Sequence, residues 1–485
     1  MFMLSHRVQW LLVATLALAL ASTQTPAASA ATGQQLWSWG NNQYGQLGNG
    51  TTLNQSEPTP VEGMSDVVKI VDTANFTTFV VRADGTVWGW GNNWGGLLGD
   101  GTTRNRLKPQ RIPKLTKVID VVTCYAATYA LSSDGTVWEW GYDSKKVSEF
   151  DTPRAKDLYG PRRMKGLSNI RSLVCNTYSW SMYAVRRNGT VLAWGNNDDG
   201  QLGNGTTASS SKPVKVSGLT KVNRIIALRR AVFGIRKDGS VWAWGDNSSR
   251  AYGDGTTHSR RLAAAVHTLK GVVDISEQKG VASGRKIFGV KSDGTVLSWG
   301  DSKRPASRIP GLRGIKKIVG SDSNVFALGT DGSLWGWGSN KFGQLGTGTR
   351  DRRTHTQPAQ IAGLPRVAKV ELSLDTVVLA LGSDGTLWSW GSDFSTYFDS
   401  EADSGILGLC DTVYQRSPMP VPALTGVTDI AVSAWSVSAL GQPTGLSCAP
   451  PQDPVPAPAS RSENPTQRST SIRRKLPAGS SRAHS

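Results

Sequence analysis

Short runs of alternating apolar and polar residues recur along this chain. In the stretch Pro58 to Gly91, "DVVKIVD" is rich in β-branched residues, and "FTTFVVRADG" alternates up to Asp84 and Gly85. "TVWGWG" follows at once, and "PTPVEGM" before them reads as a short extended piece. An Asp-Gly pair between two alternating runs predicts a tight hairpin, because the favoured two-residue turn needs positive φ. The pattern predicts units of about four short antiparallel strands and no helix.

The dipeptide Trp-Gly marks the period of these units. It occurs eight times, at intervals of 38 to 55 residues, and 14 of the 18 tryptophans lie in W-x-W-G or L-x-W-G phrases. Two tryptophans two residues apart share one face of a strand. The residue between them is small in seven units and Glu139 in the eighth, which predicts close packing in seven and a wetter face in one. The small residues are Ser38, Gly89, Ala193, Ala243, Ser298, Gly336 and Ser389.

A fixed period of about fifty residues with four strands per unit predicts a β-propeller, since one such sheet cannot bury both its faces alone. A linear β-solenoid is the alternative, but its coils are usually shorter. The chain ends complement each other: residues 34–40 supply a last strand, and residues 420–441 supply the strands before one. We expect them to join and close the ring, which removes exposed edges.

The phrase "WGNNQYGQLGNGTT…P…DVVKI…DGTVWGWG" resembles the regulator of chromosome condensation repeat over about residues 33–441. Propellers of this family usually have seven blades, whereas the eight Trp-Gly strands favour eight, with the short unit near Arg308 as the uncertain one. The resemblance implies a binding role. Exported bacterial members include a propeller-type inhibitory protein of β-lactamases, and the eukaryotic namesake binds chromatin and promotes nucleotide exchange on a small GTPase.

The two ends differ from the repeats. Residues 1–30 combine Arg7, the apolar run of residues 8–21 and small residues at 28–30, which predicts a cleaved export signal and a secreted protein. An uncleaved anchor is the alternative, although the run is short for a membrane span. We therefore expect a signal peptide at 1–30, a propeller at 31–441 and a Pro-, Ser- and Arg-rich disordered tail at 442–485.

The four cysteines permit two disulfides in an exported chain. Cys124 and Cys175 end comparable strands of consecutive repeats, which predicts that they lie side by side; Cys410 would then pair with Cys448. Four free thiols are the alternative. The net charge of +18 suggests an acidic partner or surface, and most of it lies in the repeats.

No motif for catalysis is present. The five histidines are scattered without zinc-ligand spacing, and there is no phosphate-binding loop, nucleophile elbow or calcium loop. The Asp and Asn of the turns are explained by the hairpins, including the Asn-Gly-Thr triplets that match a glycosylation acceptor. We expect a non-enzyme without cofactor or metal.

The residues that differ most from one unit to the next lie in two loops of each unit. Because successive strands alternate in direction, we expect both loops on one face of the propeller, opposite the Asp-Gly turns. Rigid loops rich in Tyr, Trp and Arg are typical of binding hot spots; the alternative is that the aromatic residues only cap the blade cores. The candidates for partner binding are Tyr44, Phe76, Trp94, Tyr125, Tyr178, Trp180, Arg229, Arg230, Phe342, Asp375 and Trp435.

Three functions follow as hypotheses. The first is a secreted, monomeric protein-binding platform, in its narrower form an inhibitor of an exported enzyme. The second is the chromatin or nucleotide-exchange role of the namesake, against which the export signal argues. The third is binding of an anionic cell-wall or surface polysaccharide, driven by charge and therefore sensitive to salt.

Overall fold

The Asp-Gly and Asn-Gly pairs form the predicted hairpin turns. In the first, Gly85 has φ +76°, and the Asp84 carboxylate accepts hydrogen bonds from the Thr86 amide (2.9 Å) and hydroxyl (2.7 Å). These hydrogen bonds hold the pKa of Asp84 below its usual value. The Asp84 carboxylate therefore stabilises the turn, which is the role that the sequence predicts for it.

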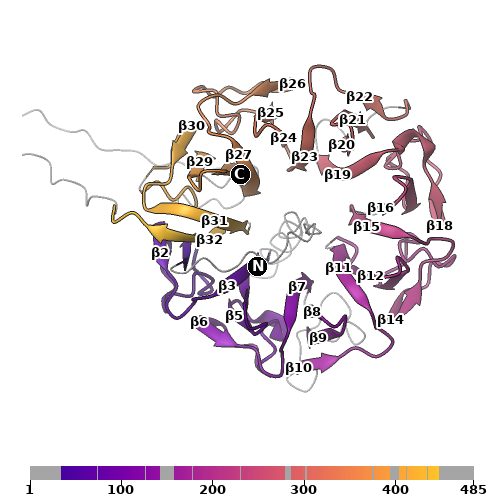
Figure 1. Ribbon diagram of the computed structural model, residues 1–485, viewed down its shortest axis with the longest axis horizontal. Coiled ribbons are helices and arrows are strands. Elements are labelled where there is room, and N and C mark those ends of the chain that lie inside the picture. Colours follow the sequence, from indigo (N-terminus) through magenta and orange to yellow (C-terminus); the bar gives the residue numbers. More distant parts are fainter. Residues whose placement is uncertain are drawn as a thin grey trace, which may run out of the picture. The chain divides into compact units, whose positions relative to one another are not determined.

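A computed structural model describes residues 34–446, except 74, 126, 143–157, 177, 230, 279–285, 301–302, 374–375, 394–403, 411 and 434. All the described residues belong to one unit. Their strands form eight four-stranded antiparallel sheets, arranged around an axis as the blades of a propeller (Figure 1). The predicted fold class is confirmed, and the count is eight rather than seven.

Blades 1 to 4 follow the chain in order, with the first strand of each nearest the axis (Figure 1). Their strands are β3 (Val67–Asp72), β4 (Thr77–Arg82), β5 (Val87–Gly91) and β6 (Arg106–Arg111); β7 (Val118–Cys124), β8 (Ala127–Ser132), β9 (Val137–Tyr142) and β10 (Leu158–Arg163); β11 (Ile170–Asn176), β12 (Ser181–Arg186), β13 (Val191–Gly195) and β14 (Ser210–Lys215); and β15 (Val222–Ala227), β16 (Ala231–Arg236), β17 (Val241–Gly245) and β18 (Arg260–Ala265).

Blades 5 to 8 complete the ring, and two short 3-10 turns, η2 (Trp94–Gly96) and η5 (His267–Leu269), are the helical elements among the described residues. The strands are β19 (Val272–Gln278), β20 (Lys286–Lys291), β21 (Val296–Trp299) and β22 (Ser307–Arg308); β23 (Ile315–Gly320), β24 (Asn324–Gly329), β25 (Leu334–Ser339) and β26 (Thr354–Gln360); β27 (Val367–Ser373), β28 (Val377–Gly382), β29 (Leu387–Ser392) and β30 (Tyr414–Pro420); and β31 (Leu424–Val432), β32 (Ser436–Pro443), β1 (Gln35–Gly40) and β2 (Gln55–Pro60).

The ring closes without a covalent link between β32 and β1. These strands pair from Gln35 opposite Gly441 to Gly40 opposite Ser436, as the sequence predicts. One detail of the prediction is wrong: the extended piece before each unit pairs with the preceding Trp strand, so β2 belongs with β1 and not with β3. Each end of the chain therefore supplies two strands to blade 8. The short unit near Arg308 is a complete blade whose outer strand has only two residues.

The second tryptophan of each phrase connects neighbouring blades. Trp90 is fully buried, and its indole N–H donates to the Gln46 carbonyl of blade 8 (2.9 Å). In the same way, the Trp140 indole N–H donates to the Leu97 carbonyl of blade 1 (2.7 Å), and the Trp244 indole N–H donates to the Gln201 carbonyl of blade 3 (2.7 Å). The small residues between the tryptophans pack closely as predicted, for instance Gly89 against Phe79. The exception, Glu139, is ion-paired with Arg162 (3.1 Å).

Candidate functional site

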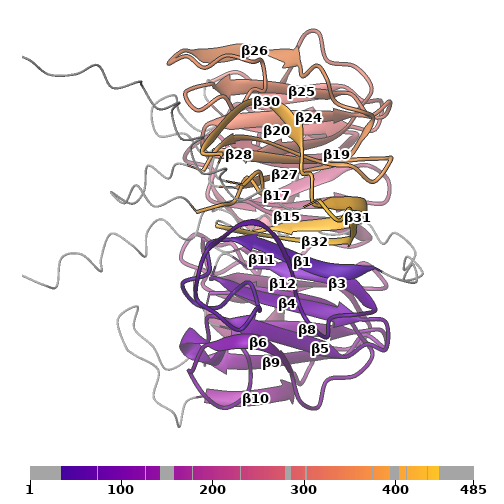
Figure 2. The same cartoon turned by 90° about the vertical axis from the view of Figure 1, so that its left-hand side faces the viewer.

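Two sets of loops share one face of the propeller, which we call the loop face. It consists of the loops between the first and second strands and between the third and fourth strands of each blade. In the edge-on view of Figure 2 the strands run from one face of the ring to the other, so the hairpin turns lie on the opposite, turn face. The rings of Tyr44, from a third–fourth loop, and Phe76, from a first–second loop, are 5.0 Å apart, which agrees with this assignment.

The loop face carries an aromatic cluster from three successive blades, formed by Trp94, Tyr125 and Trp180. The Tyr125 ring lies 5.8 Å from Trp94 of blade 1 in an edge-to-face arrangement and 4.5 Å from Trp180 of blade 3. The Trp180 side chain is 36% exposed, while Trp94 and Tyr125 are half-buried. An exposed indole on a packed aromatic base is typical of an interface anchor.

The backbone of these loops is held in an unusual conformation. Phe76, Tyr125 and Trp180 have φ of 59°, 56° and 52°, in the left-handed region that bulky residues rarely adopt. Such strain costs about 1–3 kcal/mol per residue and collects at functional sites. The Gly of each Trp-Gly pair makes room for the loop: a Cβ on Gly195 (φ +108°) would lie 2.3 Å from the Trp180 carbonyl oxygen.

Contacts between blades fix the cluster in place. The Asn75 amide of blade 1 donates to the Tyr125 carbonyl (2.7 Å), and the Asn176 amide of blade 3 donates to the Leu228 carbonyl of blade 4 (2.7 Å). Cys124, next to Tyr125, forms a disulfide with Cys175 of blade 3, with the Cα atoms 5.6 Å apart. This pairing confirms the sequence prediction and ties together the two blades that carry Tyr125 and Trp180.

The third described cysteine, Cys410, is also oxidised. Cys410 is disulfide-bonded, and no free cysteine occurs among the described residues. Its predicted partner, Cys448, lies outside them.

A second group consists of Tyr44, Phe76 and Trp435, of which Phe76 and Trp435 are buried and Tyr44 is half-buried. Phe76 and Trp435 are only 9% and 8% exposed and pack together with Tyr44 against them. The Trp435 carbonyl accepts a hydrogen bond from the Asn41 amide (2.8 Å), across the junction between β32 and β1. These contacts join the loops of blades 8 and 1.

Three other candidates, Tyr178, Arg229 and Phe342, lie on blades 3, 4 and 6, and Tyr178 shares the loop of Trp180. Arg229 of blade 4 is exposed, with its guanidinium 5.7 Å from the Tyr178 ring of blade 3. Phe342 lies on blade 6, where it contacts Lys341. Arg230 and Asp375 lie outside the described residues.

Sequence reasoning missed the residues that shape the third–fourth loops. Asn93 is fully buried, and its amide donates to Asp100 (3.1 Å) and to the Thr102 carbonyl (3.0 Å) while its carbonyl oxygen accepts from the Leu98 amide (2.8 Å). The second Asn of the recurring "WGNN" phrase was the available signal. The same role is filled by Asn42, Asn197, Asn247 and Asn340.

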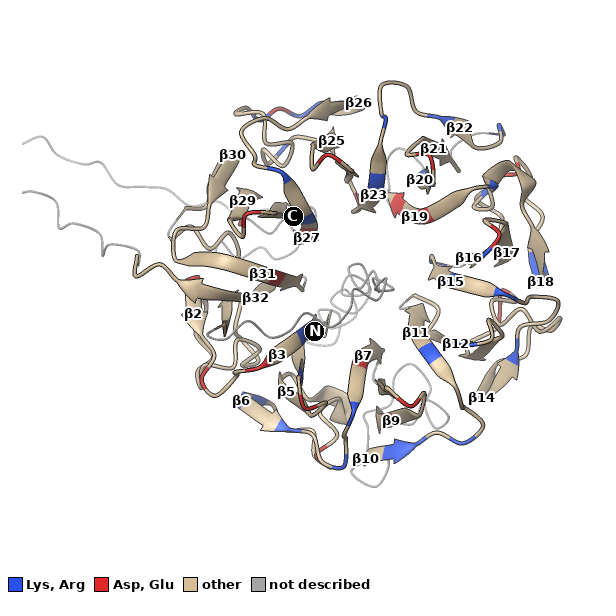
Figure 3. Cartoon of the chain, in the orientation of Figure 1, with Lys and Arg blue, Asp and Glu red and all other residues tan. Residues whose placement is uncertain are grey.

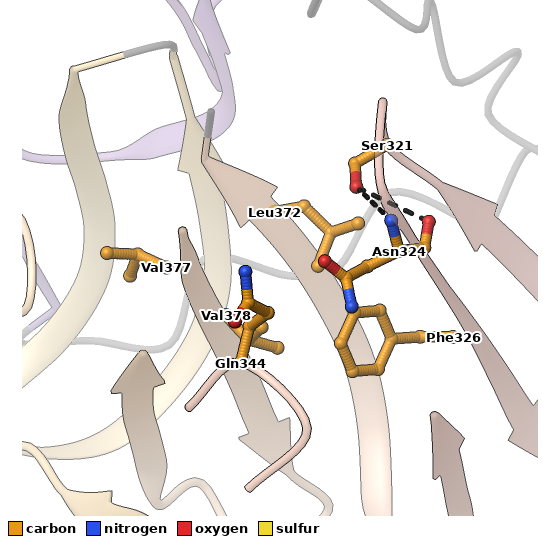
Figure 4. A pocket seen from close by; sticks show the side chains of 7 residues that line it. All are labelled: Ser321, Asn324, Phe326, Gln344, Leu372, Val377 and Val378. Atoms are coloured by element: carbon orange, nitrogen blue, oxygen red, sulfur yellow. Dashed lines mark hydrogen bonds between the residues drawn. The ribbon is translucent and has the colours of Figure 1, made fainter. Parts of the chain in front are cut away.

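A narrow cavity lies between two neighbouring blades. The cavity between blades 6 and 7 is lined by Ser321, Asn324, Phe326, Gln344, Leu372, Val377 and Val378 and holds no room for a water molecule (Figure 4). Among all the described residues, no group of three or more His, Cys, Asp or Glu side chains could hold a metal ion. No helix in the described part is long and apolar enough to span a membrane.

The family comparison identifies the repeat. The Regulator of chromosome condensation (RCC1) repeat matches residues 34–80, 84–131, 188–228 and 331–379, and a second RCC1-repeat pattern matches 315–344. The chain therefore contains RCC1 repeats at these positions. The first RCC1 match runs from β1 to β4, so it joins the outer half of one blade to the inner half of the next.

Two relatives each match less than half of the chain in sequence. The chain is 29% identical to human "E3 ubiquitin-protein ligase HERC2" over 196 residues, which are 39% of this chain and 4% of that protein. It is also 29% identical to "Ultraviolet-B receptor UVR8" of Arabidopsis thaliana over 187 residues, 38% of this chain and 42% of that protein. It thus spans less than half of either relative.

Two solved structures cover most of the chain. Yeast RCC1 (Prp20), solved with Kap60 bound, superposes with a TM-score of 0.56 at 18% identity, covering 86% of this chain and 90% of that one. Human WBSCR16 gives 0.54 at 19% identity, covering 85% and 99%. At these identities the structures establish the fold alone.

Proposed function

We propose that this chain is an exported, non-enzymatic platform that binds another protein through the loop face of blades 1 to 4. The observation that carries the proposal is the cluster in which Tyr125 lies between Trp94 and Trp180. The three residues come from separate blades, two have left-handed backbone, and a disulfide connects two of the blades. A strained and cross-linked surface of this kind loses little entropy on binding, which favours affinity.

The surroundings of the cluster favour a partner with mixed polarity. Arg229 lies on blade 4, while the exposed Asp198 and the half-buried Asp199 lie on the third–fourth loop of blade 3. Large aromatic residues and Arg are enriched at hot spots, and opposite charges beside them fix the orientation of the partner. Inhibition of an exported enzyme is the narrower form of this proposal.

The similar proteins support a protein partner. Yeast Prp20 was solved with Kap60 bound, and a second Prp20 structure is titled with its binding to Gsp1p and histones. These partners belong to that protein. Their relevance is that a propeller of this fold can present enough surface to bind macromolecules.

The test is capture by the immobilised full-length protein from the medium in which it is secreted, with the retained proteins identified. Trp180→Ala removes the exposed anchor and should lower retention of a specific partner at least about tenfold, as expected for a central hot spot. The melting temperature should change little, because the side chain is on the surface.

Tyr414→Ala is the matched control, since Tyr414 is 39% exposed on the outer strand β30, away from the cluster. It should retain the partner fully. Equal retention by both variants would contradict the proposal, and so would equal loss. Sequencing the N-terminus of the protein from the medium tests export separately: a chain beginning at Met1 and found only inside cells would refute it.

A further inference from the structure

The turn face of blades 3 and 4 carries a concentration of positive charge that the repeat does not require. The segments 165–169, 186–189, 217–221 and 236–239 contain six Lys or Arg and a single acid, Asp238. In blade 3 the turn has Asn188 where most other turns have Asp, which removes one negative charge. We call this group the basic patch; its members are Lys165, Arg186, Arg187, Lys221, Arg236 and Lys237.

Backbone hydrogen bonds join these segments into one surface. The Arg187 amide donates to the Asn169 carbonyl (2.8 Å), which places the blade 3 turn beside the loop that carries Lys165. The Val222 amide donates to the Gly189 carbonyl (3.0 Å), and the Lys237 amide donates to the Lys221 carbonyl (3.1 Å). Lys221 therefore lies between the turns of blades 3 and 4.

The arginines of the patch are held in place while the lysines are exposed. The Arg187 guanidinium donates to the Ser133 carbonyl (2.8 Å), and that of Arg186 donates to the Gly166 carbonyl (3.3 Å). Arg236 stacks 4.0 Å from the Trp242 ring. Among the described residues, no member of the patch forms a salt bridge, so its charge is available to a ligand.

The equivalent surface of blades 6 and 7 is balanced. There the segments 311–314 and 329–332 hold Arg313 and Asp331, and the segments 363–366 and 382–385 hold Arg366 and Asp384. One cation beside one acid is a neutral, solvated surface. The excess on blades 3 and 4 is thus local, and the general basic character of the chain does not account for it.

We propose that the basic patch binds an extended anionic polysaccharide. A row of fixed and exposed cations without a pocket suits a linear chain of repeated anionic groups better than a small ligand. The predicted export and the oxidised cysteines favour an extracellular polymer over nucleic acid. Because the patch is on the face opposite the aromatic cluster, such binding anchors the protein and leaves the loop face open. The choice of an extracellular polymer rests on the export in the function proposed above, whereas the patch itself involves none of the residues of the aromatic cluster.

The test compares two triple variants of the full chain with equal net charge. Arg187→Gln, Lys221→Gln and Lys237→Gln together remove three exposed cations of the patch and leave Lys165 in place. Lys303→Gln, Arg352→Gln and Arg353→Gln remove three exposed cations from the loops of blades 5 and 6. Binding to heparin, as a sulfated polysaccharide probe, is measured over a range of salt concentrations, together with a DNA duplex of equal charge.

The patch variant should bind heparin about tenfold or more weakly at physiological salt, and its slope of log affinity against log salt should fall by about three, one per cation removed. The control variant should stay within about twofold of the wild type. Equal weakening of the two variants would overturn the proposal, since net charge alone would then account for binding. Tighter, patch-dependent binding of the DNA duplex would overturn the assignment to polysaccharide.

Discussion

The loop face differs between blades 1 to 3 and blades 6 and 7, although the four-stranded sheets beneath it are the same. We call these sheets, with their Trp-Gly strands and hairpin turns, the frame. In both regions the Gly of the Trp-Gly pair lies against the loop carbonyl: Gly195 against Trp180, and Gly338 against Ser323. The residue at this point is aromatic in blades 1 and 3, where it is Phe76 and Trp180, and small and polar in blades 6 and 7, where it is Ser323 and Thr376. The sheets therefore accept either type at this point, so an aromatic residue at the position of Trp180 is not required by the sheet structure.

The link between blades differs in the same way. Cys175 of blade 3 forms a disulfide with Cys124 of blade 2, whereas the equivalent Gly320 of blade 6 lies against the Glu277 carbonyl of blade 5. In blades 5 and 6 the Gln278 amide donates to the Ser323 carbonyl (2.7 Å). Hydrogen bonds are thus sufficient to join the blades where the loops are polar, and the covalent link is found beside the aromatic cluster.

The largest effect is expected in the frame, and it should be equal in the two regions. Trp90→Ala and Trp390→Ala each remove a fully buried indole whose N–H donates to a neighbouring blade at 2.9 Å. Each should lower the free energy of unfolding by about 3–5 kcal/mol. Trp180→Ala, by contrast, should change it by about 0.5 kcal/mol or less. Denaturant unfolding measures all three, and a loss below about 1 kcal/mol for Trp90→Ala would contradict the frame role.

An intermediate effect is expected from the disulfide, and it should be confined to the aromatic region. The double variant Cys124→Ala with Cys175→Ala opens a link between residues 51 apart, which should cost about 2–4 kcal/mol. Amide hydrogen exchange should increase near Tyr125 and Trp180 and stay unchanged near Ser323. Uniform changes around the ring would show that the disulfide acts on the whole fold rather than on the cluster.

A pH-dependent effect is expected at the junction of blades 8 and 1. Both carboxyl oxygens of Asp72 are buried without a hydrogen-bond partner, although the hydroxyls of Ser438 and Thr78 lie near, and burial raises the Asp72 pKa from 3.8 to about 7. The folded state therefore prefers the protonated acid, and its contribution to stability is lost as the pH rises from about 4 to about 7.

Asp72→Asn should remove this loss. Its melting temperature should exceed that of the wild type by an amount that grows up to about pH 7 and is constant above it. Parallel melting curves of the two proteins at pH 5 and pH 8 would contradict a raised pKa at Asp72.

The sequence predicted the parts of the fold that repeat. The Asp-Gly turns, the Trp-Gly strands, the ring closure and the pairing of Cys124 with Cys175 each follow from spacing or local chemistry. The boundary of the blades was misplaced, because the period is the same whether the outer strand is counted with the preceding or the following unit. Only the pairing of β2 with β1 decides between them.

The site was predicted in part. The sequence placed the variable aromatic residues on one face, since alternating strand directions require it. It did not separate the exposed Trp180 from the buried Trp435, because both precede a strand in comparable loops and differ only in what packs over them. The role of Asn93 and the contact of Tyr125 with Trp180 likewise depend on distances between blades.

The most direct test of the central claim is hydrogen exchange of the protein with and without its captured partner. We predict protection of residues 92–96, 123–127 and 178–181, which contain Trp94, Tyr125 and Trp180, and no change at residues 321–324 of blade 6. Protection at residues 321–324 or at the hairpin turns, with none at the aromatic cluster, would contradict the claim that this cluster is the binding surface.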